Sequence, residues 1–158
     1  RSNLPGLRSG FVAGDANLMA KYLSYRTYHG CALGAHHQAA SALAWQDEAH
    51  VVENRQMYRD KFTAVSEILS PHFDLSQPEG GFYHWLPTPI CDQEFSQRLL
   101  AEQHIIVMPG SFLGRDTQQG NPGHKHVRIA WVAPFDECIV AANRLAQFAQ
   151  NLSGNFTG

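Results

Sequence analysis

Arg8 is the first residue of this sequence whose type and setting could do chemistry. It follows a Pro5-Gly6 turn signal and precedes the apolar run over residues 11–14, which predicts a short buried strand. The planar guanidinium of an arginine can hold a phosphate or a carboxylate through two parallel hydrogen bonds. The sequence therefore allows an anion site at Arg8, and the alternative is an arginine in an ordinary surface loop.

Arg128 is the second candidate, because it interrupts an otherwise apolar segment. Strand alternation places Val127, Ile129 and Trp131 on one face of a predicted strand and Arg128 on the other. A charge that is buried without a partner costs several kcal/mol. Arg128 therefore either lies at a sheet rim beside a local carboxylate or faces a place where an anion binds.

Other polar clusters support no catalytic centre by themselves. Nine histidines invite a metal interpretation, but His36-His37 would face different ways on a helix. The pair His124-Lys-His126 lies in a glycine-rich loop without an acidic or cysteine ligand at suitable spacing. Pro109-Gly110-Ser111 ends a predicted buried strand, where loops of α/β sheets meet ligands, or it is simply a turn. No nucleophile elbow, P-loop or dinucleotide-binding motif occurs, so these residues indicate anion recognition without a nucleophile and its base.

Composition narrows the class of protein. The chain has 158 residues, of which 44% are hydrophobic and 16% charged, and a net charge of −2 with neutral histidines. This balance is ordinary for a globular chain and gives no electrostatic case for binding nucleic acid or an anionic membrane. No apolar run reaches the length of a membrane span. Cys31, Cys91 and Cys138 lie far apart, which favours buried thiols in a reducing cytoplasm over disulfides.

The first part of the chain is predicted to be helical. Asp15 is a suitable N-cap for a helix over residues 16–27, and an alanine-rich helix is expected over residues 34–50. A further helix over residues 51–70 makes the helical stretch long enough for a rod between two domains. Residues 1–50 have too little to pack against, so we expect the chain to be part of something larger.

From about residue 72 the hydrophobic period becomes that of strands. Strands are predicted over 73–75, 82–86, 104–108 and 127–132, and helices are predicted to begin at Asp92 and Asp136 as their caps. The inward-facing side chains are expected to be Phe95, Leu99 and Leu100 in the first of these helices, and Cys138, Ala141, Leu145 and Phe148 in the second. The order of elements predicts an α/β sandwich of one sheet and one helical layer.

Several motifs together resemble a known family. Ser2-Asn-Leu-Pro-Gly-Leu-Arg8 resembles the segment after the catalytic lysine of fold-type I, pyridoxal-phosphate-dependent aminotransferases of the aspartate aminotransferase type. In that family a Ser-x-x-Lys motif is followed, eight residues after the lysine, by the arginine that holds the cofactor phosphate, and Arg8 has this spacing. Gly80-Gly81-Phe82 resembles the family's glycine-glycine-aromatic strand, Val107-Met-Pro-Gly110 its V-x-P-G loop, and Arg128 its arginine for the substrate α-carboxylate.

The resemblance reaches to about residue 150 and implies a fold and a cofactor. The fold is α/β, with the end of a large cofactor-binding domain over 1–50, a connecting helix over 51–71 and a small α+β domain over 72–158. The small domain would have a mixed sheet with helices on one side. The cofactor would be pyridoxal 5'-phosphate, bound by Arg8, with substrate bound by Arg128. Because the catalytic lysine would precede Arg1, we expect this chain to be the C-terminal part of the enzyme and to be inactive alone.

Further segments resemble a narrower group. The whole stretch from Ser2 to Asp15 is similar to bacterial succinyldiaminopimelate aminotransferase, which transfers an amino group from glutamate on the route to lysine and the cell wall. Four shorter segments are similar to it as well: Tyr28-His-Gly-Cys31, Gln38-Ala-Ala-Ser41, Asp47-Glu-Ala-His50 and Gly120-Asn-Pro-Gly123. This implies a cytoplasmic homodimer that acts on amino acids and 2-oxo acids, with the polar loop over 111–125 near the distal part of the substrate. The alternatives are a non-catalytic domain that binds a small anion or a protein, and an aminotransferase of another specificity.

Overall fold

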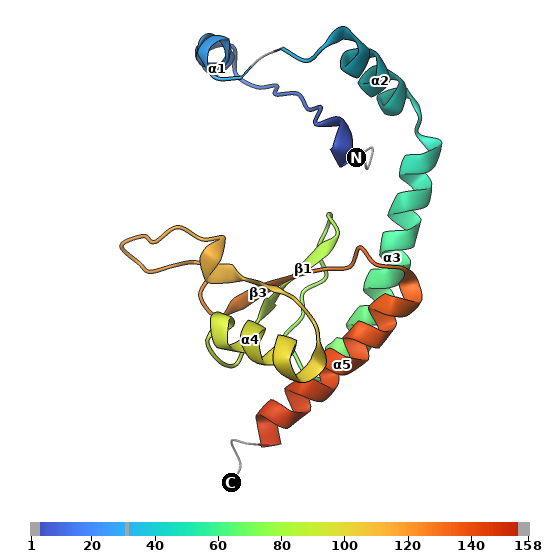
Figure 1. Ribbon diagram of the computed structural model, residues 1–158, viewed down its shortest axis with the longest axis vertical. Coiled ribbons are helices and arrows are strands. Elements are labelled where there is room, and N and C mark those ends of the chain that lie inside the picture. Colours follow the sequence, from blue (N-terminus) through green and yellow to red (C-terminus); the bar gives the residue numbers. More distant parts are fainter. Residues whose placement is uncertain (1–3, 31, 155–158) are drawn as a thin grey trace. The chain divides into compact units, whose positions relative to one another are not determined.

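The chain falls into two units, which meet inside the helix α3 (Ala49–Leu69). The computed structural model describes residues 4–30 and 32–154, and the division lies between Arg55 and Gln56. The N-terminal unit holds a short 3-10 helix, η1 (Pro5–Leu7), and the helices α1 (Ala16–Tyr28) and α2 (Ala35–Gln46). The C-terminal unit holds the sheet and, among the described residues, two further α-helices and a second short 3-10 helix (Figure 1).

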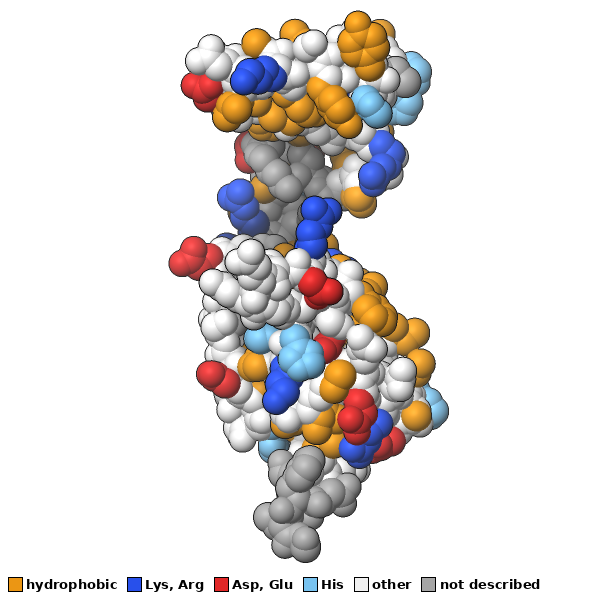
Figure 2. Space-filling model, turned by 90° about the vertical axis from the view of Figure 1, so that its left-hand side faces the viewer, with side chains coloured by type: hydrophobic (Ala, Val, Ile, Leu, Met, Phe, Trp, Pro, Cys, Tyr) orange, Lys and Arg blue, Asp and Glu red, His pale blue; other side chains and the backbone are white. Residues whose placement is uncertain are grey.

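The N-terminal unit has its predicted helices but little buried apolar surface. The carboxylate of Asp15 accepts hydrogen bonds from the amides of Asn17 and Leu18, both at 3.0 Å, which confirms the predicted cap. No side chain of α1 is buried, and Ser41 is the buried residue of α2. Large apolar side chains of this unit lie on its surface, among them Phe11, Leu18, Leu23, Tyr28 and Leu43 (Figure 2). Such a surface is typical of a segment that packs against more protein.

Three of the five predicted strands are wrong. Residues 11–14 form no strand, and the side chain of Phe11 is 75% exposed. A strand needs a neighbour for its backbone hydrogen bonds, and within the described part of the chain none pairs with this segment. Residues 73–75 also form no strand, although Phe73 is buried. Its apolar side chain enters the core from the turn that follows α3. Of residues 104–108, predicted to be a strand, Met108 alone lies in one, and Ile106 is 83% exposed.

The sheet of the C-terminal unit is small and antiparallel. Among the described residues it consists of β1 (Tyr83–Pro87), β3 (His126–Ala130) and β2 (Met108–Pro109), in this spatial order. The helix α4 (Asp92–Gln103) links β1 to β2, so these two strands run in the same direction, and β3 lies between them and antiparallel to both. The α/β class is confirmed. A mixed sheet was expected, but the sheet is antiparallel. The two parallel strands, β1 and β2, do not pair with each other, because β3 lies between them.

The core of this unit lies on one face of the sheet. The helices α4 and α5 (Phe135–Gly154) and the second half of α3 supply it together with the sheet (Figure 1). Its members include Phe62, Val65 and Leu69 from α3, Leu86, Val127 and Ile129 from the sheet, Phe95 and Leu99 from α4, and Cys138, Leu145 and Phe148 from α5. Leu100, which was predicted to point inward, is 47% exposed. The buried stripe of α4 follows Asp92, Phe95, Ser96 and Leu99 instead.

The chain beyond β3 is held by α3. The strand ends at Ala130, two residues earlier than predicted, yet Trp131 is still buried and Val132 is exposed. The ammonium group of Lys61 donates hydrogen bonds to the carbonyl oxygens of Trp131, at 3.2 Å, and Ala133, at 2.6 Å. A side chain of α3 thus satisfies carbonyl groups that have left the sheet.

Two smaller predictions can be compared with the structure. Cys138 is buried as expected and Cys91 is half-buried, whereas Cys31 lies outside the described residues. Over residues 4–30 and 32–154, no helix has the length and apolar character needed to cross a membrane.

Candidate functional site

Arg128 lies on the open face of the sheet. In β3, Val127 and Ile129 are buried in the core while Arg128 between them is partly exposed. In β1, His84 and Leu86 are buried in the same way, and their neighbours point to the open face. The predicted alternation around Arg128 is therefore confirmed, and its side chain is directed away from the helices.

Aromatic and apolar residues lie beside Arg128 on the sheet. Its direct partners in the register of the sheet are Trp85 on β1 and Met108 on β2. The guanidinium carbon lies 5.7 Å from the centre of the Tyr83 ring, within the range of a cation–π contact. Within the described part of the chain, no carboxylate forms an ion pair with Arg128. A partly buried guanidinium without an acidic partner can take an anionic ligand.

The indole of Trp85 is held next to this arginine. Its ring stacks on the imidazole of His126, with ring centres 5.5 Å apart and planes 10° from parallel. Its edge lies against Gly110, where an added β-carbon would come within 2.8 Å of Trp85 Cη2. Sequence reasoning did not single out Trp85, and it considered His126 only as a possible metal ligand. The signal was available, because strand alternation puts both on the same face as Arg128.

The Pro109-Gly110-Ser111 segment is a turn whose backbone crosses another. A 3-10 helix, η2 (Gly110–Phe112), follows β2 directly. A β-carbon on Gly110 would clash with the carbonyl oxygen of Gly123, and one on Gly123 would clash with the carbonyl group of Gly110. Glycine is therefore required on both sides of the crossing, for close approach of two backbones. This crossing forms the base of the polar loop over residues 111–125.

Asp92 was predicted to cap α4, but the structure gives it another role. Cys91 is the N-cap, and Asp92 is the first residue of the helix with a fully buried side chain. Its carboxylate accepts hydrogen bonds from the backbone amides of Ser111 and Lys125. Sequence reasoning could not find this contact, because the two donors are backbone groups far along the chain.

Arg8 lies in the N-terminal unit, directly after η1. Its backbone is left-handed, with φ 51°, and its amide donates to the carbonyl oxygen of Pro5. Its side chain is exposed and donates a long hydrogen bond, 3.4 Å, to the same oxygen. A non-glycine residue in this conformation is uncommon, and such residues gather at functional sites. Arg8 and Arg128 belong to different units of the chain.

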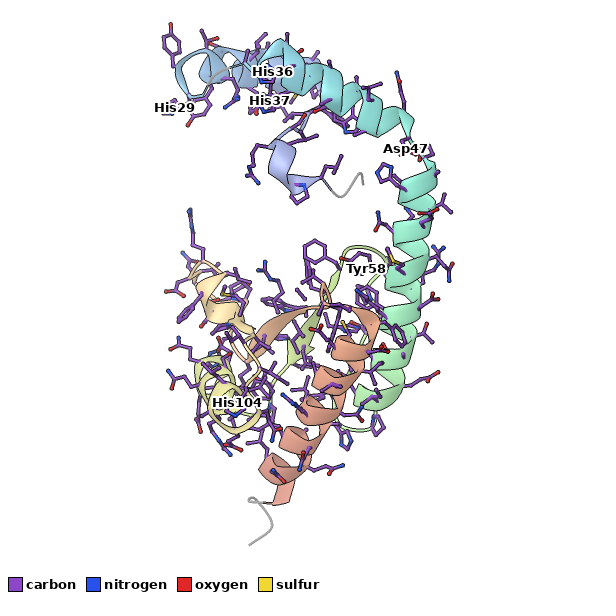
Figure 3. All side chains as sticks on the ribbon, turned by 45° about the vertical axis from the view of Figure 1, so that its right-hand side comes forward. His29, His36, His37, Asp47, Tyr58 and His104 are labelled. Atoms are coloured by element: carbon purple, nitrogen blue, oxygen red, sulfur yellow. The ribbon has the colours of Figure 1, made fainter. Side chains whose placement is uncertain are left out.

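The histidines singled out in the sequence contact one another or other side chains. His36 and His37 lie side by side at the start of α2, with ring centres 4.3 Å apart (Figure 3). His124 approaches the Asp92 carboxylate at 3.5 Å, whereas His126 stacks on Trp85. Across the residues that the structure describes, no group of three or more His, Cys, Asp or Glu could hold a metal ion.

Comparison with known proteins finds relatives that are named aminotransferases. The chain matches the family model for aminotransferase class I and II over residues 1–144. A probable aminotransferase of Mycobacterium tuberculosis is 34% identical over 147 residues, which are 91% of this chain and 33% of that protein. The crystal structure of an aminotransferase from Neisseria meningitidis is 50% identical with a TM-score of 0.84, and the match covers 94% of this chain and 38% of that one.

A third relative carries a more specific name. The structure of a probable N-succinyldiaminopimelate aminotransferase from Thermus thermophilus is 28% identical, with a TM-score of 0.75. The match covers 92% of this chain and 38% of that chain. This chain therefore spans between about a third and two fifths of the length of the relatives it matches.

Proposed function

The chain belongs to the class I and II aminotransferases, and we propose that it forms the C-terminal part of a pyridoxal-phosphate-dependent transaminase acting on amino acids and 2-oxo acids. The observation that carries this proposal is Arg128, a guanidinium on an open sheet face without an acidic partner among the described residues. An amino acid and its 2-oxo acid share one anionic group, the α-carboxylate. One arginine can therefore hold the substrate in both halves of the reaction.

The proposed organisation follows the two units. Residues 1–50 are the end of the large, cofactor-binding domain, residues 51–71 are the connecting helix, and residues 72–158 are the small domain. The exposed apolar side chains of α1 and α2 support the first assignment, since they need more protein to cover them. The continuous course of α3 across the division at residue 55 supports the second.

Arg8 fits the phosphate group of the cofactor. Its guanidinium is exposed and bonded through one N–H to Pro5, which leaves further donors for the oxygens of a phosphate. Pyridoxal phosphate held there would supply the electron sink that transamination needs. Arg8 would hold the phosphate by charge-assisted hydrogen bonds. Arg128 would fix the carboxylate, so that the substrate keeps one orientation.

Proton transfer is assigned to no residue of this chain. A lysine is the usual base in this chemistry, and the sequence contains no Ser-x-x-Lys motif. We therefore expect the chain to bind anions through its two arginines and to catalyse no transamination by itself.

The finer proposal is a succinyldiaminopimelate transaminase that uses glutamate as amino donor in diaminopimelate and lysine biosynthesis. The likeness to the Thermus protein and the four short motifs named above support it. We further propose that the intact enzyme is a cytoplasmic homodimer, and that the loop over residues 111–125 lies near the distal part of the substrate. The competing specificity is that of another amino acid, since the relatives differ in name.

An acceptor and donor panel on the intact enzyme tests both levels of the proposal. The gene that encodes this chain is expressed in full, and glutamate formation from 2-oxoglutarate is followed with succinyldiaminopimelate, aspartate, phenylalanine and methionine as donors. The finer proposal predicts the highest kcat/KM for succinyldiaminopimelate. A higher value for another donor would refute that specificity only. No transfer from any donor would refute the transaminase, in favour of a non-catalytic anion- or protein-binding domain.

A further inference from the structure

A single buried carboxylate joins the two ends of the loop over residues 111–125. The side chain of Asp92 has no solvent-exposed surface. Its Oδ2 accepts a hydrogen bond of 2.9 Å from the amide of Ser111, just after β2. Its Oδ1 accepts one of 3.2 Å from the amide of Lys125, just before β3. The loop is thus closed at its base by one residue of α4.

The carboxylate is held as an anion by these donors. Burial would raise the pKa of Asp92, but the hydrogen bonds from Ser111 and Lys125 outweigh burial and leave it below its usual value. Its position in the first turn of α4 also favours negative charge. The imidazole of His124, 3.5 Å from Oδ1, is the nearby side chain that could carry positive charge. Removing one oxygen would leave a buried N–H donor without an acceptor, which is costly.

The backbone of Lys125 depends on this contact. Its φ is 56°, in the left-handed region that a lysine rarely adopts. Its amide is held by Asp92, and its carbonyl oxygen accepts a hydrogen bond of 2.8 Å from the amide of Thr88, directly after β1. A strained conformation persists where neighbours fix it from both sides. The carboxylate of Asp92 therefore stabilises the start of β3.

Both ends of the loop lead to the ring beside Arg128. Gly110 precedes Ser111 and lies against the edge of Trp85. Lys125 precedes His126, whose imidazole stacks on the face of the same indole. Trp85 is the direct register partner of Arg128. A change in the base of the loop would thus move the two groups that support Trp85.

From these contacts we infer that Asp92 is a positioning residue for Arg128, acting through the base of the 111–125 loop and the indole of Trp85. The inference rests on the proposed function, in which Arg128 holds the carboxylate of an amino acid. Asp92 itself touches no substrate. It fixes the base of the loop and thereby the indole of Trp85, the residue that pairs directly with Arg128 in the register of the sheet.

The test is Asp92→Asn in the intact enzyme, which keeps the side-chain shape but offers one acceptor oxygen to two amide donors. We expect KM for the amino donor to rise about tenfold, with kcat changed less than threefold, because carboxylate binding is weakened equally in the ground and transition states. Asp136→Asn is the matched control. Asp136 is also acidic and lies in the first turn of a helix, but it is exposed. Its KM is expected to stay within twofold of the wild type.

A merely structural role of Asp92 would give another result. Loss of folded enzyme lowers the apparent kcat and leaves KM unchanged, so a folded Asp92→Asn enzyme with wild-type KM would overturn the inference. If Asp92→Asn does not fold, Asp92→Glu keeps the charge and shifts it by one carbon, and a KM within twofold of wild type would likewise overturn it. A double variant with Arg128→Lys should show much less than the product of the two KM effects.

A measurement without catalysis separates this inference from the proposed function. In amide hydrogen exchange, Asp92→Asn should speed exchange at Ser111 and Lys125 at least tenfold, and Asp136→Asn should not. Unchanged exchange at both amides would overturn the inference whatever the enzyme does. Absence of transamination in the wild-type enzyme would refute the proposed function, and with it the role of Asp92 toward a substrate, even if the exchange result holds.

Discussion

The indole of Trp131 donates a hydrogen bond of 2.8 Å from Nε1 to Nδ1 of His84 in the core of the C-terminal unit. Both side chains are buried, and the ring of Phe62 meets the imidazole edge-on at 4.9 Å. The bond requires Nδ1 to be an acceptor, so the proton of the neutral ring is on Nε2, which has no partner among the described residues. Burial lowers the pKa of His84 to about 4.

This histidine predicts acid sensitivity of the C-terminal unit. The unfolded chain takes up a proton on His84 near pH 6.5, whereas the folded chain does so only near pH 4. The free energy of unfolding should therefore fall as the pH drops from 6.5 to about 4, by at most about 3 kcal/mol. Urea unfolding at pH 7, 5.5 and 4.5 measures this slope. The lowered pKa of Asp92 acts only at lower pH, since its contribution is lost below its ordinary value of 3.8.

The matched variants are His84→Gln and His104→Gln. Glutamine can still accept the hydrogen bond from Trp131 but does not titrate, so His84→Gln should flatten the slope. His104 is exposed, and its replacement should leave the slope as in the wild type. A steep slope that survives in His84→Gln would show that another group causes the acid sensitivity.

The crossing of Gly110 and Gly123 predicts a strong effect of one methyl group. Gly110→Ala should lower the free energy of unfolding by more than about 2 kcal/mol, because the added carbon would meet backbone and the Trp85 ring. Gly80→Ala is the control, since nothing lies within 4 Å of a β-carbon there. Its effect should stay within about 0.5 kcal/mol. Equal unfolding midpoints for the two variants would contradict the close crossing.

The hydrogen bonds of Lys61 predict that α3 stabilises the segment that follows β3. Lys61→Met keeps the aliphatic stem but removes the donor to the carbonyl oxygens of Trp131 and Ala133, and should cost about 1–3 kcal/mol. Arg59→Met removes a charge from the same helix that bonds only locally, to Gln56. Chemical denaturation of both variants decides the matter. If the Lys61→Met and Arg59→Met proteins were equally stable, the stabilising role of the Lys61 hydrogen bonds would be refuted.

Sequence patterns predicted the parts of this fold that depend on local signals. Asp15 capped α1, and alternation put Arg128 opposite Val127 and Ile129. The same patterns were wrong for residues 11–14, where an apolar run has no partner strand in the described chain. Apolar runs indicate burial, but the partner decides whether a strand forms.

The contacts that hold the residues of the candidate site in place could not be predicted from local sequence patterns. The contact of Asp92 with Ser111 and Lys125 joins backbone groups 19 and 33 residues away. The stack of Trp85 on His126 depends on the antiparallel register of β1 and β3, which the turn signals did not determine. Residue type and local setting marked the two arginines as candidates, and for Arg128 the physical reason is that a cation within an apolar strand needs a partner.

Arg8 predicts a defect that is specific for the phosphate of the cofactor. In the intact enzyme, Arg8→Ala should weaken binding of pyridoxal phosphate by roughly 10- to 100-fold, as expected for the loss of charge-assisted hydrogen bonds. Binding of pyridoxal, which lacks the phosphate, should change less than threefold. Absorbance titration measures both. Arg55→Ala, at another exposed arginine of the same unit, serves as the control.

An equal loss of affinity for pyridoxal and pyridoxal phosphate in Arg8→Ala would show that Arg8 supports the fold and not the phosphate. Unchanged affinity for both would remove Arg8 from the cofactor site altogether.

The most direct test of the account asks whether Arg128 recognises the carboxylate of the substrate. Phenylalanine and phenylethylamine differ only in that group, and their kcat/KM values as amino donors are compared in the intact enzyme. For Arg128→Leu we predict that the preference for phenylalanine falls by roughly 100-fold or more, while the exposed Arg144→Leu keeps it. A preference that stays within threefold of the wild type in Arg128→Leu would contradict the account.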